Sequence, residues 1–177
     1  KPSIEQQTVA LDKIDELTMF IEDHHDWNLR LPNQGGVATF YHVTLTPNDP
    51  PADATLKDKD EHLRQERERL HRQIGACPLF PTFIIDTGAS YQCVWETLAP
   101  VSAALAGTIN QRLSAYFRAP VVGDHLHLPY TTYHPSFAEQ RKGWAEGLIR
   151  VIEDDSGDAY APEDFDVLTA GPPLDLA

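Results

Sequence analysis

The sequence predicts an α+β domain in which a mixed or antiparallel sheet is flanked by helices. Some stretches alternate apolar and polar residues, the period of a half-buried strand, while others repeat apolar residues every three or four positions, as helices do. The chain has 177 residues, 41% of them apolar, which is enough for one domain with a sizeable core. We expect this domain to span residues 1–167, with an acidic tail or the start of a linker at 168–177.

The first elements are expected to be a helix and a strand. Ser3 and Gln6 have the spacing of a capping box, and apolar residues follow at helical intervals, so a helix is expected over residues 4–23. A turn at 33–36 precedes a segment, 40–46, whose alternating apolar residues predict a strand.

A charged helix and a pair of strands are expected next. Residues 57–74 are mostly charged but carry one apolar stripe, which predicts a helix that packs through Leu63, Leu70 and Ile74. Two β-rich segments, 82–86 and 91–97, are joined by the turn at 87–90 and predict a hairpin.

The C-terminal part is expected to be mainly helical. Residues 100–118 predict a helix that packs through Leu105, Ile109, Leu113 and Phe117. Residues 120–136 are expected to form a strand and loops, 139–152 a short helix, and Pro162 begins a last helix.

The net charge of −13 is opposite in sign to that of most nucleic-acid-binding proteins. Eight of the acidic residues lie in 151–177, which holds no Lys or Arg, so residues 1–150 carry only −5. The uneven charge therefore keeps nucleic acid among the expected partners.

The composition indicates a cytoplasmic protein with no membrane partner. Its two cysteines, Cys77 and Cys93, lack metal-type spacing and are expected to be free thiols of a reducing compartment. No apolar run reaches the roughly 20 residues that span a bilayer, and the N-terminus has no signal-peptide pattern.

An apolar run ends in Asp86-Thr87-Gly88-Ala89, the pattern of the catalytic loop of an aspartic protease. Such enzymes need two carboxylates that share one proton, so Asp86 would have to pair with its copy in a dimer. The helices predicted on both sides of the motif argue against the almost all-β protease fold.

Four segments in order resemble the archaeo-eukaryotic primase superfamily, specifically its phage and plasmid primase–polymerases. The first, residues 81–95, is an apolar strand, a turn and a strand that contains Tyr-Gln. The second, 128–135, begins with Leu-Pro, and the third, 141–144, is Arg-Lys-Gly-Trp. The last, 160–165, contains a Tyr and ends in Asp-Phe. The resemblance implies a primase–polymerase core and template-directed nucleotide transfer in phage or plasmid replication. It departs from the family at His127, where the family has Arg, and at Tyr130, where it has Gly.

The resemblance also implies a metal site. Such a site holds Mg²⁺ or Mn²⁺ between carboxylates, and two acids in an Asp-x-Asp pattern on a strand would face the same way. Asp58 and Asp60 have this pattern, and Asp124 is the candidate third acid, but the pair opens a predicted helix. The alternative alignment places Thr44 and Thr46 at the paired positions, which would make the enzyme degenerate.

The nucleotide contacts implied by the resemblance are Ser90, Gln92, His127 and Lys142. Nucleotides and a DNA template are the expected partners, together with a helicase or other replication protein. Three functions stay open at this point: a metal-dependent primase–polymerase, a catalytically inactive primase-like module that binds nucleic acid or protein, and a dimeric aspartic protease.

Overall fold

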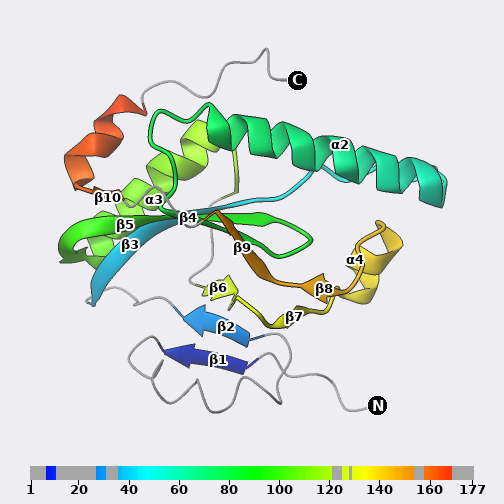
Figure 1. Cartoon of the computed structure of the whole chain (residues 1–177), viewed down its shortest axis with the longest axis horizontal. Helices are drawn as coiled ribbons and strands as arrows, with labels where there is room; N and C mark the ends of the chain where they lie inside the picture. The colour runs from blue at the N-terminus through cyan, green and yellow to red at the C-terminus, as the bar shows by residue number, and fades with distance from the viewer. Residues whose placement is uncertain are drawn as a thin grey trace.

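A five-stranded sheet organises the chain, whose computed structural model describes residues 7–10, 27–30, 36–120, 125–127, 129–153 and 158–168 (Figure 1). The elements along the chain are β1 (Gln7–Ala10), β2 (Trp27–Arg30), β3 (Val37–Leu45), α2 (Leu56–Gly75), β4 (Phe83–Asp86), β5 (Tyr91–Ser102), α3 (Ala103–Phe117), β6 (His125–His127), β7 (Thr132–Tyr133), α4 (Phe137–Arg141), β8 (Gly147–Leu148), β9 (Arg150–Glu153), β10 (Ala159–Tyr160) and the 3₁₀ helix η3 (Pro162–Val167).

The long strand β5 is the centre of this sheet. On one side it pairs with β3 in antiparallel register. On the other side it pairs with β4, also antiparallel, and farther along with β10 in parallel. The strand β9 adds to the outer side of β4. The predicted α+β class with a mixed sheet and flanking helices is therefore confirmed.

The two faces of the sheet have different coverings. Tyr91, Cys93 and Trp95 of β5 belong to the main core, which includes buried residues of α2 and α3. Gln92 and Val94 alternate with them and so point to the opposite face, where Val94 packs with Leu126 of β6. The helices and β6 therefore lie on opposite sides of the sheet (Figure 1).

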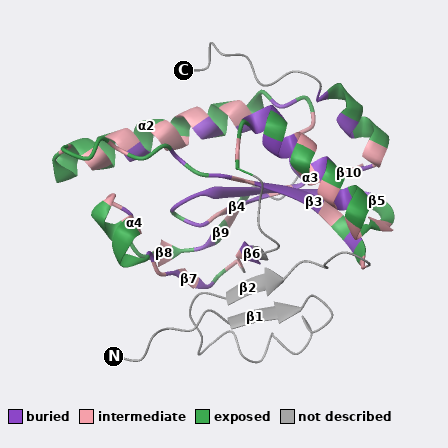
Figure 2. Ribbon diagram, turned by 180° about the vertical axis from the view of Figure 1, so that it is seen from behind, coloured by how far each residue is buried: buried purple, intermediate pink, exposed green. Residues whose placement is uncertain are grey.

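The helix α2 forms as its sequence predicts. Thr55 caps it by accepting a hydrogen bond from Asp58 N, and the predicted stripe of Leu63, Leu70 and Ile74 is buried. Figure 2 shows this arrangement as buried patches spaced along a helix that is otherwise half-buried or exposed. Within the described residues, no helix is both long and apolar enough to cross a membrane.

The helix α3 begins at Ala103, three residues later than predicted, because β5 continues to Ser102, which caps the helix. Ile109, Leu113 and Phe117 are buried as expected, but Leu105 is exposed and Ala106 packs in its place. The buried face is therefore one position out of phase at its N-terminal end.

The predicted N-terminal helix is wrong where it can be compared. Gln7–Ala10 form β1, which pairs in parallel with β2, and β2 pairs with β6 to complete a three-stranded sheet. Thr8 and Val9 are β-branched and suit a strand, and the pairing partners lie far away in the sequence. The rest of the predicted helix, 11–23, lies outside the described residues.

The predicted helix at 139–152 is also wrong over most of its length. The helix α4 ends at Arg141, and Gly143 follows with φ of +101°, a conformation that ends a helix. The chain then forms β8, which pairs with β7, and β9, which pairs with β4. The last helix begins at Pro162 as predicted. Leu168, the first residue of the expected tail, packs into the core. Residues 169–177 lie outside the described residues.

Candidate nucleotide site

Gln92 and His127 come together, as the sequence hypothesis requires. The backbone N–H of His127 donates a hydrogen bond of 2.8 Å to Oε1 of Gln92. A backbone N–H can only donate, so this bond fixes the oxygen of the amide and leaves its amino group as a donor. Gln92 of β5 is buried. The residue opposite it on the neighbouring strand β3 is Thr44, which is half-buried. We call the sheet surface that carries these residues the Gln92 face.

His42 lies on the same face, two residues before Thr44, and was not singled out from the sequence. It is buried, and its Nδ1 lies 3.1 Å from Nδ2 of Asn110 in α3. Oδ1 of Asn110 accepts a 2.9 Å bond from the backbone N–H of His42, so its Nδ2 is the donor to the ring. In the neutral imidazole the proton is therefore on Nε2. The signal in the sequence was the alternation of His42 with apolar residues of β3.

The Gln92 face carries few acids. Among the described strand positions that share it, Glu96 is the one carboxylate, and it is exposed and four residues from Gln92, about 13 Å along an extended strand. Thr44 supplies a neutral hydroxyl where the alternative alignment has its first acid, and Thr46 follows the end of β3. The described parts of the chain contain no group of three His, Cys, Asp or Glu residues arranged to hold a metal ion.

Asp58 and Asp60 lie elsewhere. Asp58 is in the first turn of α2 and Asp60 follows it, and this helix covers the opposite side of the sheet from Gln92. Oδ2 of Asp58 accepts a 2.6 Å bond from Thr55, and residues two apart on a helix point in different directions. These acids therefore do not converge on one ion beside Gln92. Asp124 lies outside the described residues, directly before β6.

Ser90 and Lys142 are held by local interactions. Ser90 is buried in the β4–β5 turn, where its Oγ lies 3.0 Å from Oγ1 of Thr87 and its backbone N–H donates to that same oxygen. The Nζ of Lys142 forms a 2.9 Å ion pair with Asp49. Because Lys59 of α2 donates to the carbonyl of Arg141, Lys142 lies beside the start of α2 and apart from Gln92.

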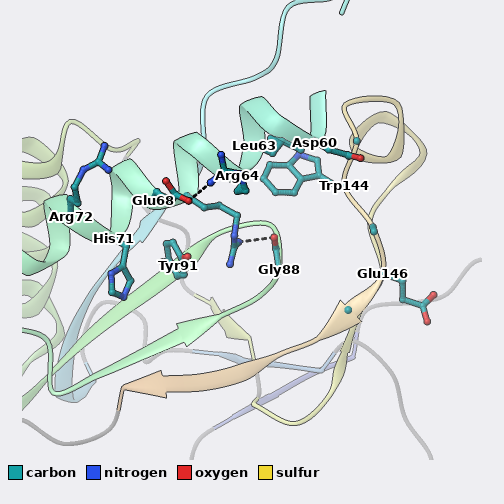
Figure 3. A pocket seen from close by; sticks show the side chains of 14 residues that line it. Asp60, Leu63, Arg64, Glu68, His71, Arg72, Gly88, Tyr91, Trp144 and Glu146 are labelled. Carbon is teal, nitrogen blue, oxygen red and sulfur yellow. Dashed lines mark hydrogen bonds and ion pairs between the residues drawn. The ribbon is translucent and has the colours of Figure 1, made fainter. Parts of the chain in front are cut away.

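A groove of about 770 Å³ lies on the α2 side of the sheet (Figure 3). Leu63, Tyr91, Trp144 and Asp60 are among the residues that line it. The guanidinium of Arg67 lies 4.7 Å from the centre of the Tyr91 ring and donates to the carbonyl of Gly88. Burial raises the pKa of the Tyr91 hydroxyl, and the charge of Arg67 opposes this effect. Within this groove Arg64 pairs with Glu68, and Arg67 is bound to the β4–β5 turn.

Asp86, the residue of the protease hypothesis, has structural partners. Its Oδ2 forms a 2.7 Å ion pair with Arg67, and its Oδ1 accepts a 2.8 Å bond from the backbone N–H of Gly88. A protease dyad instead needs a second carboxylate beside the first. The α2 and α3 helices that pack on this sheet are also foreign to an almost all-β protease. The interactions of Asp86 are those of a turn.

The comparisons with known proteins give one distant structural likeness. No protein-family model matches the sequence, and no curated protein matches it significantly. Among solved structures, the chain is similar to the AEP domain of the cyanophage S-2L primase-polymerase (PrimPol), with a TM-score of 0.43 and 16% sequence identity. The alignment covers 75% of this chain and 60% of that one, so the chain spans about three fifths of its length. The likeness is one of overall fold and is distant.

Proposed function

We propose that this chain is a primase-like module whose Gln92 face binds a nucleotide or the end of a single-stranded nucleic acid without transferring nucleotides. The observation that carries the proposal is the Gln92 amide. Its oxygen is held by His127, and its amino group takes no acceptor among the described residues, so it is available to a phosphate or base oxygen. In the family that the sequence resembles, this position contacts the nucleotide.

Access to this amide is expected from the Thr44 end of β3. Thr44 is half-buried and Thr46 exposed, whereas His42, farther along the strand, is buried. A ligand that enters here would meet the hydroxyl of Thr44 first and then the amide of Gln92, both neutral donors. Neutral donors can hydrogen-bond a phosphate group, whereas metal-dependent transfer requires carboxylates that hold the metal ion.

Metal-dependent nucleotide transfer on a DNA template is the second candidate. Asp124 favours it, because it directly precedes β6, whose His127 contacts Gln92. Mg²⁺ or Mn²⁺ would then need further carboxylates, and the described residues of the Gln92 face do not fit such an ion. The catalytic and metal-binding roles of Asp58, Asp60 and Asp124 stay predictions, as does the association with a helicase or replication protein.

Calorimetry with a nucleoside triphosphate tests the binding proposal. Gln92→Glu keeps the oxygen that accepts from His127 but replaces the amino donor by a negative charge, so we expect at least a tenfold loss of affinity with the fold intact. Asp58→Asn is the matched control and should bind as the unaltered chain does. Equal binding by Gln92→Glu and the unaltered chain would remove the proposal.

Primer extension with Mn²⁺, a template and labelled nucleotides separates binding from transfer. The binding module gives no product with any variant. Product that disappears in Asp124→Asn but persists in Asp58→Asn would establish transfer at the Gln92 face and assign Asp124 to it. Product that depends on Asp58 and Asp60 would place the active site at the start of α2.

A further inference from the structure

Tyr130 has a backbone conformation that is unusual for a bulky residue. Its φ is +67°, in the left-handed region, and its side chain is 68% exposed. The left-handed conformation is strained for an L-residue with a Cβ. No burial of the ring offsets this strain, so the packing of the side chain does not explain why a tyrosine is there.

The strain is maintained by well-anchored neighbours. The backbone N–H of Tyr130 donates a 2.8 Å bond to the carbonyl of Ile149, and the N–H of Ile149 donates a 2.9 Å bond to the carbonyl of Thr131. Ile149 and Thr131 are both buried. The ring therefore projects into solvent from a turn whose backbone is anchored, three residues beyond His127 of the Gln92 face.

Two neighbours of Ile149 extend this surface. Leu148 is 48% exposed, and Arg150 is exposed with no ion pair among the described residues. An exposed ring, an aliphatic side chain and an unpaired cation thus come from two segments that are hydrogen-bonded to each other. We call Tyr130, Leu148 and Arg150 the Tyr130 platform.

We propose that the Tyr130 platform stacks a base of single-stranded nucleic acid and that Arg150 contacts the adjacent phosphate. Proteins that bind single strands combine aromatic side chains, on which bases stack, with cations that follow the backbone. The inference rests on the proposed function, since the platform would bind the same nucleic acid at a second place. In the register of the sheet Arg150 pairs with Asp86, which pairs with Tyr91, so Arg150 lies on the α2 side of the sheet and outside the Gln92 face. Stacking tolerates any base, so we expect little sequence preference.

The size of the platform favours a base over a protein partner. A stable protein interface buries about 800 Å² on each partner, and three side chains supply far less. One phosphate contact predicts a shallow salt dependence, with a slope near −0.7 in a plot of log K against log salt concentration. A shallow slope also fits a chain whose net charge is −13.

Fluorescence anisotropy with a labelled single-stranded oligonucleotide at low salt tests the platform. Tyr130→Gly should weaken binding at least fivefold, the lower limit for loss of one stacked base. It should also raise the melting temperature, because glycine adopts a positive φ without strain. Tyr130→Phe keeps the ring and should bind within twofold of the unaltered chain. Tyr130→Asn, which tolerates the left-handed conformation but has no ring, should behave as Tyr130→Gly does.

Unchanged affinity in Tyr130→Gly and Tyr130→Asn would overturn the inference, and so would an absence of oligonucleotide binding by the unaltered chain. Arg150→Gln should flatten the salt dependence, and an unchanged slope would exclude the phosphate contact. The triphosphate assay with Gln92→Glu reports on the proposed function separately. If Gln92→Glu loses triphosphate binding but Tyr130→Gly binds the oligonucleotide normally, the platform alone is removed. If Gln92→Glu binds the triphosphate normally but Tyr130→Gly loses oligonucleotide binding, the Gln92 site alone is removed.

Discussion

Two tyrosines contact the same buried ring, that of Phe165, but their hydroxyls have different surroundings. The Tyr160 hydroxyl donates a 2.6 Å bond to the carbonyl of Phe80. The Tyr41 hydroxyl is buried and has no hydrogen-bond partner among the described residues. A buried polar group without a partner costs about 1–3 kcal/mol. Burial and the charges of Glu163 and Asp164 also raise the pKa of Tyr41.

This difference predicts opposite effects of the same substitution. Tyr41→Phe removes the unpaired hydroxyl and should raise the free energy of unfolding by about 1 kcal/mol. Tyr160→Phe leaves the Phe80 carbonyl unpaired and should lower it by about 1 kcal/mol. Urea denaturation of both variants measures the difference. If Tyr41→Phe lowers the free energy of unfolding as much as Tyr160→Phe does, the Tyr41 hydroxyl is not an unpaired buried group.

Local sequence signals predicted the elements that depend on local interactions. The helix α2 follows from its cap and its apolar stripe, and the β4–β5 hairpin from its turn residues. The strands β1 and β9 were missed because each is determined by a partner that is distant in sequence, β2 or β4. A helical spacing of apolar residues in such segments has less weight than the pairing of backbone groups across the sheet.

The β4–β5 turn predicts a contrast between two glycines. Gly88 has φ of +83° and no atom within 4 Å of an added Cβ, so Gly88→Ala is strained by the backbone alone and should cost about 1–2 kcal/mol. Gly107, within α3, also has open space for a Cβ but no positive φ. Gly107→Ala should therefore stabilise by about 0.5–1 kcal/mol. Thermal unfolding of the two variants should shift in opposite directions, and a shared direction would contradict this account.

At the scale of the whole molecule, the sequence did not reveal on which face of the sheet each predicted site residue lies. Gln92 and His127, both expected to contact the nucleotide, are joined by a hydrogen bond, and their role in binding stays a prediction. Asp58 was assigned to the same site, yet α2 packs on the other side of the sheet. A sequence motif specifies only the types and spacing of its residues. The side of the sheet on which a helix packs depends on the whole hydrophobic core, so the motif did not show where Asp58 would lie.

The central core predicts a loss of stability in alkali. Burial raises the pKa of the Cys77 thiol to about 11 and raises that of the fully buried Cys93 further. A thiol in the unfolded chain ionises near pH 8.5. The unfolded state therefore releases protons above that pH while the folded state retains them, and stability falls as the pH rises.

For Cys93 the expected loss is about 1.4 kcal/mol for each pH unit above roughly 8.5. Urea denaturation at pH 7, 9 and 10 measures the slope. Cys93→Ala lowers stability at every pH but should flatten the dependence, and Cys77→Ala should flatten it to a similar degree, because both thiols stay protonated in the folded state up to pH 10. A Cys93→Ala variant with an unchanged slope would show that other groups titrate in this range.

The bond between Asn110 and the backbone of His42 also has a consequence for self-association. Among the described strands, β3 pairs only with β5, so its outer side is an open edge to which a strand of another molecule could add. The Asn110 amide occupies the N–H group of His42 that such a strand would use. A side chain of α3 thus takes the place of a neighbouring strand and limits growth of the sheet from one molecule to the next.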